Sequence, residues 1–188
     1  MDAVVALTTR VSPLKLGSES PQGAALDNIL NAGLRAPDHG RLRPWKFLLV
    51  RGVARNRFGS VLEEALRMRE PTATERVLQA EREKPLRAPL IVVVAASIRE
   101  DSKVPAIEQQ LCAAAAAQNM LIAAHAQGFG GFWRTGAPSY DFYVKRALRL
   151  READAIVGFL YLGNVATPGP AKQPDPTGVV EEWTGDDG

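Results

Sequence analysis

The sequence predicts a single domain that contains both helices and strands around one core. The chain has 188 residues, which suits one domain, and 46% of them are hydrophobic. Its apolar residues recur at helical spacing in some segments and form short continuous runs in others. No internal repeat or linker divides the chain, so we expect residues 1–188 to form one domain. The last stretch, about 167–188, is too polar to pack as a helix alone and is expected to lie as an arm over another surface.

Four helices and four strands are expected in order along the chain. The first helix begins after Asp2, which is placed to cap it, and Pro37 ends the second. Helical spacing of apolar residues predicts helices at 2–9, 24–35, about 58–66 and 106–127. Apolar runs of strand length predict strands at 47–50, 89–96, 129–134 and 156–162.

Three segments of the chain carry further information about burial. The run 89–96 is β-branched and apolar on both faces, so it is expected at the centre of a sheet. The helix at 106–127 is apolar nearly all round, which is typical of a helix inside a domain or at a subunit interface. Between residues 63 and 87 the charges alternate in sign, a pattern typical of a solvated helical face.

Charge and cysteine content narrow the class of protein. The chain has 23 basic and 21 acidic residues, a near balance that argues against a nucleic-acid partner. Its one cysteine, Cys112, has no internal partner for a disulfide, as is usual in a reducing cytoplasm. The N-terminus lacks a basic segment and a cleavage site, and the longest apolar run, 111–124, is shorter than the roughly 20 residues of a membrane span. We therefore expect a cytoplasmic protein without a membrane partner.

Several kinds of catalytic site are excluded by the absence of their motifs. The two histidines are far apart and there is no Cys pair, so a metal site is not expected. Neither a G-x-S-x-G elbow nor a P-loop occurs. Gly128-x-Gly130 lacks the third glycine of the dinucleotide fingerprint and follows a helix instead of a strand. Any demanding reaction would therefore have to come from a bound organic cofactor.

The segment 128–136, Gly-Phe-Gly-Gly-Phe-Trp-Arg-Thr-Gly, combines glycines, aromatic residues and one arginine. Glycines let the backbone approach a ligand closely, and arginine suits phosphate recognition. These residues favour a seat for a flat, phosphorylated cofactor. The alternative is a helix end followed by a glycine-containing edge strand, with Trp133 in the core.

Further candidate contacts lie near the ends of the first two expected helices. Arg10 and Arg35 could bind phosphate, but a cation at a helix C-terminus is also favoured by the helix dipole. His39 stands in a Pro-Asp-His-Gly turn, which does not need an imidazole, although Asp38 could simply support the turn. His125, on the apolar helix, reads either as a core histidine or as a ligand-binding residue.

Taken together, these segments resemble the nitroreductase family, in particular its short YdjA-like branch of FMN-dependent NAD(P)H oxidoreductases. The resemblance runs in order from about residue 2 to residue 178. It rests on Arg10-x-Ser12, Arg35-Ala-Pro-Asp-His39 leading to Pro44-Trp45, Lys103-Val-Pro105 with Glu108-Gln109, and the segments 126–136 and 157–163. It implies an α+β fold with a central, mainly antiparallel sheet flanked by helices, and an intertwined homodimer with two FMN sites at the subunit interface.

The resemblance also implies site residues and an activity. The cofactor-binding residues would be Arg10, Val11, Ser12, Arg35, Trp133, Arg134 and Thr135, with His39 reaching the FMN of the partner subunit. The nicotinamide nucleotide would bind at Ala123, Ala124, His125, Ala126, Gln127 and Gly128. Electrons would pass from NADH or NADPH through FMN to a nitroaromatic, a quinone or a similar acceptor, with no catalytic residue beyond the cofactor. Two alternatives are an FMN-binding storage or sensor protein without turnover, and a structural helical dimer.

Three departures from the family pattern concern the substrate. Val11 stands where a second arginine is usual, and Ile107 stands where a tryptophan is frequent. The turn after the histidine carries Gly40, Arg41 and Arg43 where related chains have lysine, serine and glutamine. These positions leave the size and charge of the preferred acceptor open.

Overall fold

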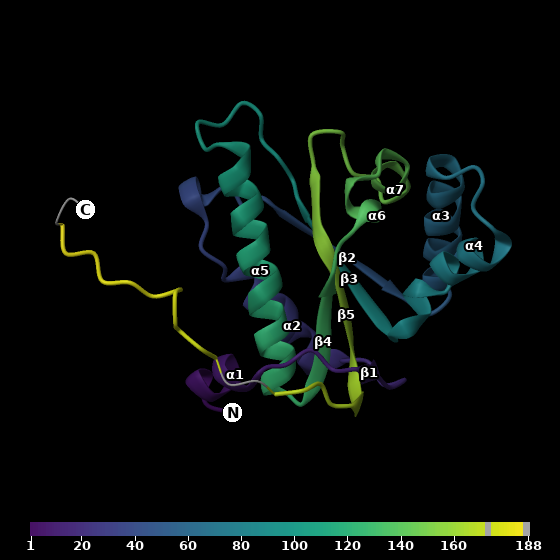
Figure 1. Ribbon diagram of the computed structural model, residues 1–188. Coiled ribbons are helices and arrows are strands. Elements are labelled where there is room, and N and C mark those ends of the chain that lie inside the picture. Colours follow the sequence, from purple (N-terminus) through teal and green to yellow (C-terminus); the bar gives the residue numbers. More distant parts are fainter. Residues whose placement is uncertain (172–173, 186–188) are drawn as a thin grey trace.

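The computed structural model describes residues 1–171 and 174–185. Within them, a five-stranded sheet separates two layers of helices (Figure 1). The helices are α1 (Ala3–Thr9), α2 (Gly23–Leu34), α3 (Ala54–Arg69), α4 (Glu75–Arg82), α5 (Ala106–Ala126), α6 (Ala137–Tyr140) and α7 (Phe142–Ala147), with 3₁₀ turns η1 (His39–Arg41) and η2 (Lys84–Arg87). The strands are β1 (Lys15–Leu16), β2 (Trp45–Arg51), β3 (Leu90–Ala96), β4 (Phe129–Arg134) and β5 (Ala155–Thr167).

The long strand β5 organises the sheet. β3 pairs with residues 155–162 of β5, and β4 pairs with residues 159–164, so β3 and β4 must lie on opposite edges of β5. β1 pairs with β5 beyond these registers, and β2 pairs with the outer edge of β3. Every strand pair among the described residues is antiparallel. The expected α+β class with a mainly antiparallel central sheet is therefore confirmed.

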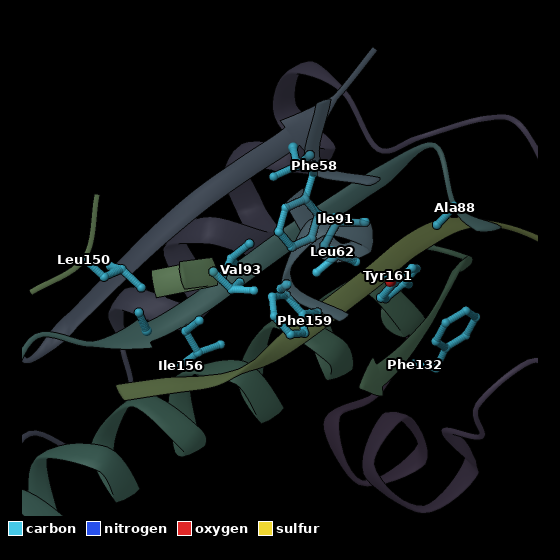
Figure 2. Packing of buried hydrophobic residues seen from close by; sticks show 14 of the residues in the cluster. Phe58, Leu62, Ala88, Ile91, Val93, Phe132, Leu150, Ile156, Phe159 and Tyr161 are labelled. Atoms are coloured by element: carbon cyan, nitrogen blue, oxygen red, sulfur yellow. The ribbon is translucent and has the colours of Figure 1, made fainter. Parts of the chain in front are cut away.

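Alternating side chains of β3 supply two separate cores. All seven residues of this strand are buried, which confirms its expected central position. Ile91 and Val93 face the layer of α3 and α7, whereas Val92 and Val94 face α2 and α5. Figure 2 shows the first of these cores, in which the Phe58 ring of α3 packs on the sheet.

The layer formed by α2 and α5 is closely packed at its centre. Gly33 of α2 lies against Met120 of α5, and a Cβ atom at Gly33 would come within 2.3 Å of the Met120 Cε atom. The Asn119 amide also donates a hydrogen bond to the Ala32 carbonyl oxygen at 3.1 Å. The expectation of a helix inside the domain is therefore confirmed for the second half of α5. Its first half leaves large apolar side chains exposed.

Other expected elements are confirmed with small shifts of their ends. The Asp2 carboxylate accepts hydrogen bonds from the backbone N–H groups of Val4 and Val5, so it caps α1 as expected. β5 extends five residues beyond the expected strand and ends at Thr167, because its last residues pair with β1. The sequence pattern did not reveal β1, which has only two residues.

The charged run between residues 63 and 87 is only partly a solvated face. It comprises the end of α3, all of α4 and η2. α4 packs so closely on α3 that a Cβ atom at Gly59 would come within 2.2 Å of the Arg82 carbonyl oxygen. As a result Glu81 is 7% exposed and Leu78 is 1% exposed. The prediction of a solvated face is wrong at Glu81, because charge alternation does not reveal which side of a short helix meets its neighbour.

The chain beyond β5 leaves the body of the molecule and extends past α1 (Figure 1). Val179, Val180 and Trp183 are all more than 70% exposed. Residues 172–173 and 186–188 of the expected arm lie outside the described residues. That the arm lies on the surface of another chain stays a prediction.

Candidate functional site

Two adjoining cavities open on the α3 side of the sheet, where the end of β4 meets η2. Their volumes are about 230 and 400 Å³, and they share Arg87, Phe132 and Arg134 as lining residues. We call them together the β4 cavity. The first is lined in addition by Phe58, Leu62, Lys84, Thr135, Pro138, Phe159 and Tyr161, and the second by Leu14, Lys15, Leu16 and Leu86.

The alternation of β4 decides which residues reach this cavity. Phe132 and Arg134 project from one face of the strand toward the cavity, so the intervening Trp133 projects from the other face. Gly136 has a φ of 99°, a left-handed value that a glycine adopts easily, and it turns the chain into α6. Thr135 is thereby left at the cavity rim.

Aromatic rings form one wall of the β4 cavity. The Phe132 and Tyr161 rings stack with their centroids 5.1 Å apart and an angle of 20° between their planes. The Arg134 guanidinium lies 5.0 Å from the centre of the Phe132 ring. A flat surface and a planar cation are therefore side by side at the end of β4.

The electrostatics of the cavity are dominated by cations. Lys84 forms an ion pair with Glu81, whose other carboxylate oxygen, Oε1, is buried without a hydrogen-bond partner among the described residues. Burial raises the pKa of Tyr161 to about 12, and Glu81 adds to this while Arg87 and Arg134 oppose it. The Tyr161 phenol therefore stays protonated at neutral pH. Four cations, Lys15, Lys84, Arg87 and Arg134, line the cavity and Glu81 is paired with one of them, so the cavity suits a ligand that carries negative charge.

The segment containing Arg10 and Ser12 approaches the same cavity from the opposite end of β4. Arg10 is the C-cap of α1, and Leu14, two residues after Ser12, lines the cavity. The backbone at Ser12 lies against Gly169, where a Cβ atom would come within 1.9 Å of the Ser12 carbonyl oxygen. Leu14 thus lies at the same cavity as Arg134, whereas Thr9, next to Arg10, contacts His125 at the end of α5. Contact of Arg10, Val11 and Ser12 with FMN stays a prediction.

Trp133 lies on the α5 side instead. Its indole N–H donates a hydrogen bond to the Val157 carbonyl oxygen at 3.1 Å, and the ring covers Gly158. One side of the ring lines a separate cavity of about 400 Å³ together with Ile107 and Leu111 of α5. The half-buried position favours the packing interpretation of the Trp133 side chain. Contact with FMN stays a prediction for this residue.

His39 and Arg35 are also on the α5 side. The His39 Nδ1 atom lies 2.5 Å from the Glu108 carboxylate in the first turn of α5, and Arg35 is the C-cap of α2. Beside His39 is a shallow apolar cavity of about 260 Å³ against α5. Within one chain, therefore, these two residues do not meet Arg134.

The segment expected to bind the nicotinamide nucleotide forms the end of α5 and the turn after it. Ala124 is fully buried. The Gln127 amide donates to the Ala25 carbonyl oxygen at 3.3 Å and accepts from Asn28 at 3.2 Å, so it joins α5 to α2. The Nε2 atom of His125 lies 3.0 Å from the Thr9 hydroxyl. His125 is thus half-buried and has a hydrogen-bond partner, and nucleotide binding at 123–128 stays a prediction.

Four polar residues that line the β4 cavity were not expected as site residues from the sequence. They are Lys15, Lys84, Arg87 and Tyr161. Lys84 and Arg87 belong to the charged run that was interpreted as solvated. The available signal was their position directly before the central strand, where a turn brings them over the sheet. Tyr161 lies in the strand expected at 156–162, which contributed to the family resemblance but held no expected site residue.

Two negative findings complete the survey of residues 1–171 and 174–185. No three or more His, Cys, Asp and Glu side chains come together there in a way that could hold a metal ion. Nor does any helix there have the length and apolarity needed to span a membrane.

The fold described above, an antiparallel sheet between two helical layers, is shared with a known family. The model of the nitroreductase family matches residues 7–164, and the chain belongs to that family. The chain is 43% identical over 182 residues to the Escherichia coli (strain K12) protein named "Putative NAD(P)H nitroreductase YdjA", with 96% of this chain and 98% of that protein covered.

Solved structures share the fold at lower identity. A nitroreductase-like family protein from Bacillus cereus superposes with a TM-score of 0.78 at 20% identity, covering 98% of this chain and 97% of that one. A nitroreductase with bound FMN from Bacteroides fragilis superposes with a TM-score of 0.74 at 18% identity, covering 97% of this chain and 99% of that one. These two likenesses establish the fold.

Proposed function

We propose that this protein is an oxidoreductase that binds FMN and transfers electrons from NADH or NADPH to nitroaromatic, quinone or similar acceptors. The observation that carries the proposal is the β4 cavity, where Arg134 and Thr135 of the family-like segment meet Lys84 and Arg87 beside stacked aromatic rings. The near-complete alignment with a relative named as an NAD(P)H nitroreductase supports the same activity.

The residues of the cavity fit FMN chemically. The isoalloxazine ring is flat and largely apolar, as is the wall formed by Phe132 and Tyr161. Its polar edge and the phosphate group need hydrogen-bond donors and positive charge, which Arg134, Lys84 and Arg87 supply. When bound, FMN supplies hydride transfer, and the protein supplies orientation and electrostatics.

The protein groups act by holding charge and protons in place. The cations at Lys84, Arg87 and Arg134 favour negative charge on a ligand in the cavity. Since Tyr161 keeps its proton at neutral pH, its hydroxyl is available as a hydrogen-bond donor. Apolar residues such as Phe58 and Leu62 exclude water from the same space. None of these groups is required as a nucleophile.

We further propose that the active form is a homodimer. Ile107 and Leu111 of α5 are each 59% exposed on the same side as His39. Tyr140 and Phe142 add exposed aromatic area, and Trp183 of the arm is 90% exposed. Exposed apolar surface of this kind is typical of an interface that a second subunit covers.

The visible spectrum of the purified protein tests the cofactor. The proposal expects a yellow protein with flavin absorption bands and a released cofactor that elutes as FMN. Release of FAD, or an apoprotein that does not bind added FMN, would contradict it. Steady oxidation of NADH or NADPH in the presence of menadione separates an enzyme from a storage or sensor protein, which would bind FMN without turnover.

Subunit exchange tests the shared site. We expect a chain with Arg134→Ala and a chain with His39→Ala each to have low activity alone. If each site draws Arg134 from one chain and His39 from the other, a mixed dimer has one intact site and one doubly altered site. Activity should then rise toward half of the wild-type value per mixed dimer. No rise after exchange has been verified would contradict the shared site, as would a monomer in light scattering.

A further inference from the structure

The turn that follows α2 is held in an unusual conformation. Arg41 and Arg43 have φ values of 54° and 49°, in the left-handed region that residues other than glycine, asparagine and aspartate rarely adopt. The Asp38 carboxylate fixes the turn by accepting hydrogen bonds from the backbone N–H groups of Leu42 at 3.0 Å and Arg43 at 2.8 Å. The backbone between Asp38 and β2 is therefore well defined, although most of its side chains are exposed.

An arginine gives the backbone no advantage at either position. A left-handed residue that carries a large side chain costs on the order of 1–2 kcal/mol, and glycine or asparagine would cost less. Both guanidinium groups are exposed, and neither forms an ion pair or a hydrogen bond with any residue in 1–171 or 174–185. What these two residues add to the turn is positive charge directed into solvent.

The acidic groups near this turn already have partners. Asp38 accepts the two backbone hydrogen bonds, and Glu108 is bound to His39. Arg35, at the end of α2, adds a third exposed arginine to the same part of the surface. The turn is consequently a cationic surface with a fixed shape.

A shallow cavity adjoins this cationic surface and contains His39 in its wall. Its remaining lining is mostly apolar and comprises Pro37, Glu108, Leu111, Cys112 and Ala115. The volume of about 260 Å³ suits one or two small rings. An apolar surface with fixed cations at its edge matches an aromatic molecule that carries an anionic group.

We propose that Arg41 and Arg43 determine specificity by binding the carboxylate or sulfonate group of an anionic aromatic acceptor, whose ring lies against the shallow cavity. The inference rests on the proposed function and on the shared site, in which this turn lies beside the flavin of the partner subunit. The two arginines act on the choice of acceptor, and FMN binding does not depend on them. An exposed ion pair contributes modestly, so each arginine accounts for a few-fold preference.

Asparagine is the informative replacement, because it tolerates the left-handed conformation without the positive charge. The test compares the wild type with a double variant, Arg41→Asn and Arg43→Asn. The matched control is Arg57→Gln with Arg76→Gln, which removes two exposed arginines from α3 and α4. Each protein is assayed with menadione, a neutral naphthoquinone, and with 1,4-naphthoquinone-2-sulfonate, its anionic counterpart.

We expect the ratio of kcat/KM for the sulfonate to kcat/KM for menadione to fall about five- to twentyfold in the double variant and to stay constant in the control. The wild-type ratio should also fall as salt is added. FMN affinity should be unchanged, and Tm should not decrease, because asparagine relieves backbone strain. A structural role for the two arginines would instead lower Tm and reduce activity with both quinones.

Other results would overturn the inference. An unchanged ratio in the double variant does so directly. Weaker use of NADPH relative to NADH in stopped-flow reduction of the flavin, with the quinone ratio unchanged, would assign the arginines to the 2′-phosphate of the donor. If the wild type reduces neither quinone, the proposed function fails, and the inference fails with it. If the wild type, the double variant and the control all reduce menadione and the ratio does not change, the inference about Arg41 and Arg43 fails while the proposed function stands.

Discussion

Replacement of Arg134 by alanine tests the assignment of the β4 cavity most directly. The guanidinium group lies at the cavity rim, 5.0 Å from the centre of the Phe132 ring. A hydrogen bond to a charged group contributes about 1.5–3 kcal/mol. Because Arg134 is exposed to solvent, we take the lower end, about 1.5 kcal/mol, which corresponds to a roughly tenfold loss of FMN affinity. The FMN affinity of Arg134→Lys should lie between those of the wild type and Arg134→Ala, since lysine keeps the charge but loses the planar pair of donors.

The assay is a titration of the apoprotein with FMN in which quenching of the flavin fluorescence reports binding. Arg146→Ala is a matched control, because Arg146 also lies over an aromatic ring, at 5.8 Å from the centre of Tyr143, but lines none of the cavities described above. Loss of the cation–π contact should lower stability slightly and similarly in both variants, by about 0.5 kcal/mol. Only Arg134→Ala should weaken FMN binding.

Two results would refute this reasoning. If Arg134→Ala binds FMN as tightly as the wild type does, Arg134 has a packing role on Phe132 and no contact with the cofactor. If Arg134→Ala and Arg146→Ala weaken binding equally, the loss comes from stability and not from the cavity. Added salt should also reduce the difference between wild type and Arg134→Ala, because screening weakens an exposed charge–charge contact.

Three further predictions concern stability and partners. Gly158→Ala should lower the free energy of unfolding, measured by urea denaturation, by at least about 2 kcal/mol. The new Cβ atom would lie 2.0 Å from the Trp133 Nε1 atom and would break the hydrogen bond from that atom to the Val157 carbonyl oxygen. An unchanged denaturation midpoint would show that the Trp133 ring can shift freely. Burial acts to raise the pKa of Asp154, but hydrogen bonds from Arg151 hold this pKa below its ordinary value of 3.8. The ionised Asp154 carboxylate therefore stabilises the fold above about pH 4, and this contribution is lost as the pH falls through the lowered pKa. The Tm gap between wild type and Asp154→Asn should therefore narrow below about pH 4, and a gap independent of pH would contradict this assignment. Near-balanced charge predicts no submicromolar binding of random duplex DNA at moderate salt, which a mobility-shift assay checks.

Much of the fold could be predicted from the sequence because its main elements are specified locally. The continuous apolar run of β3, the helical spacing of α2 and the length of the apolar α5 each identify the element within one segment. β1 could not be predicted, since two residues show no pattern and their strand exists only through pairing with β5. α4 and η2 were likewise hidden inside a run whose charges suggested exposure.

The candidate site divides in the same way. Arg134 and Thr135 could be proposed from residue type and from the family resemblance, because glycines and an arginine in one short segment are informative. The position of Lys84 and Arg87 before β3 indicates only that they lie near the sheet, since their contribution to the cavity depends on how α4 packs against α3 and brings η2 over the sheet. The opposite orientation of Trp133 follows from strand alternation, but only after β4 is known to have a covered face on each side.

The distribution of the expected FMN contacts over two sides of the sheet is itself an argument about assembly. Arg134 lines the β4 cavity on the α3 side, and His39 lies against α5 on the other side. The sheet between them is filled by buried side chains such as Val92 and Val93, so the two residues of one chain are separated by a packed layer and share no cavity. Either one of these two contacts is wrongly assigned, or they come from different chains. The second explanation also accounts for the exposed apolar residues of α5, which lie on the same side as His39 and have no covering element in the described part of the chain. If the two contacts come from different chains, a variant with a charge at Leu111, such as Leu111→Glu, should weaken dimerisation and lower FMN affinity together. Loss of one property without the other would separate the interface from the flavin site.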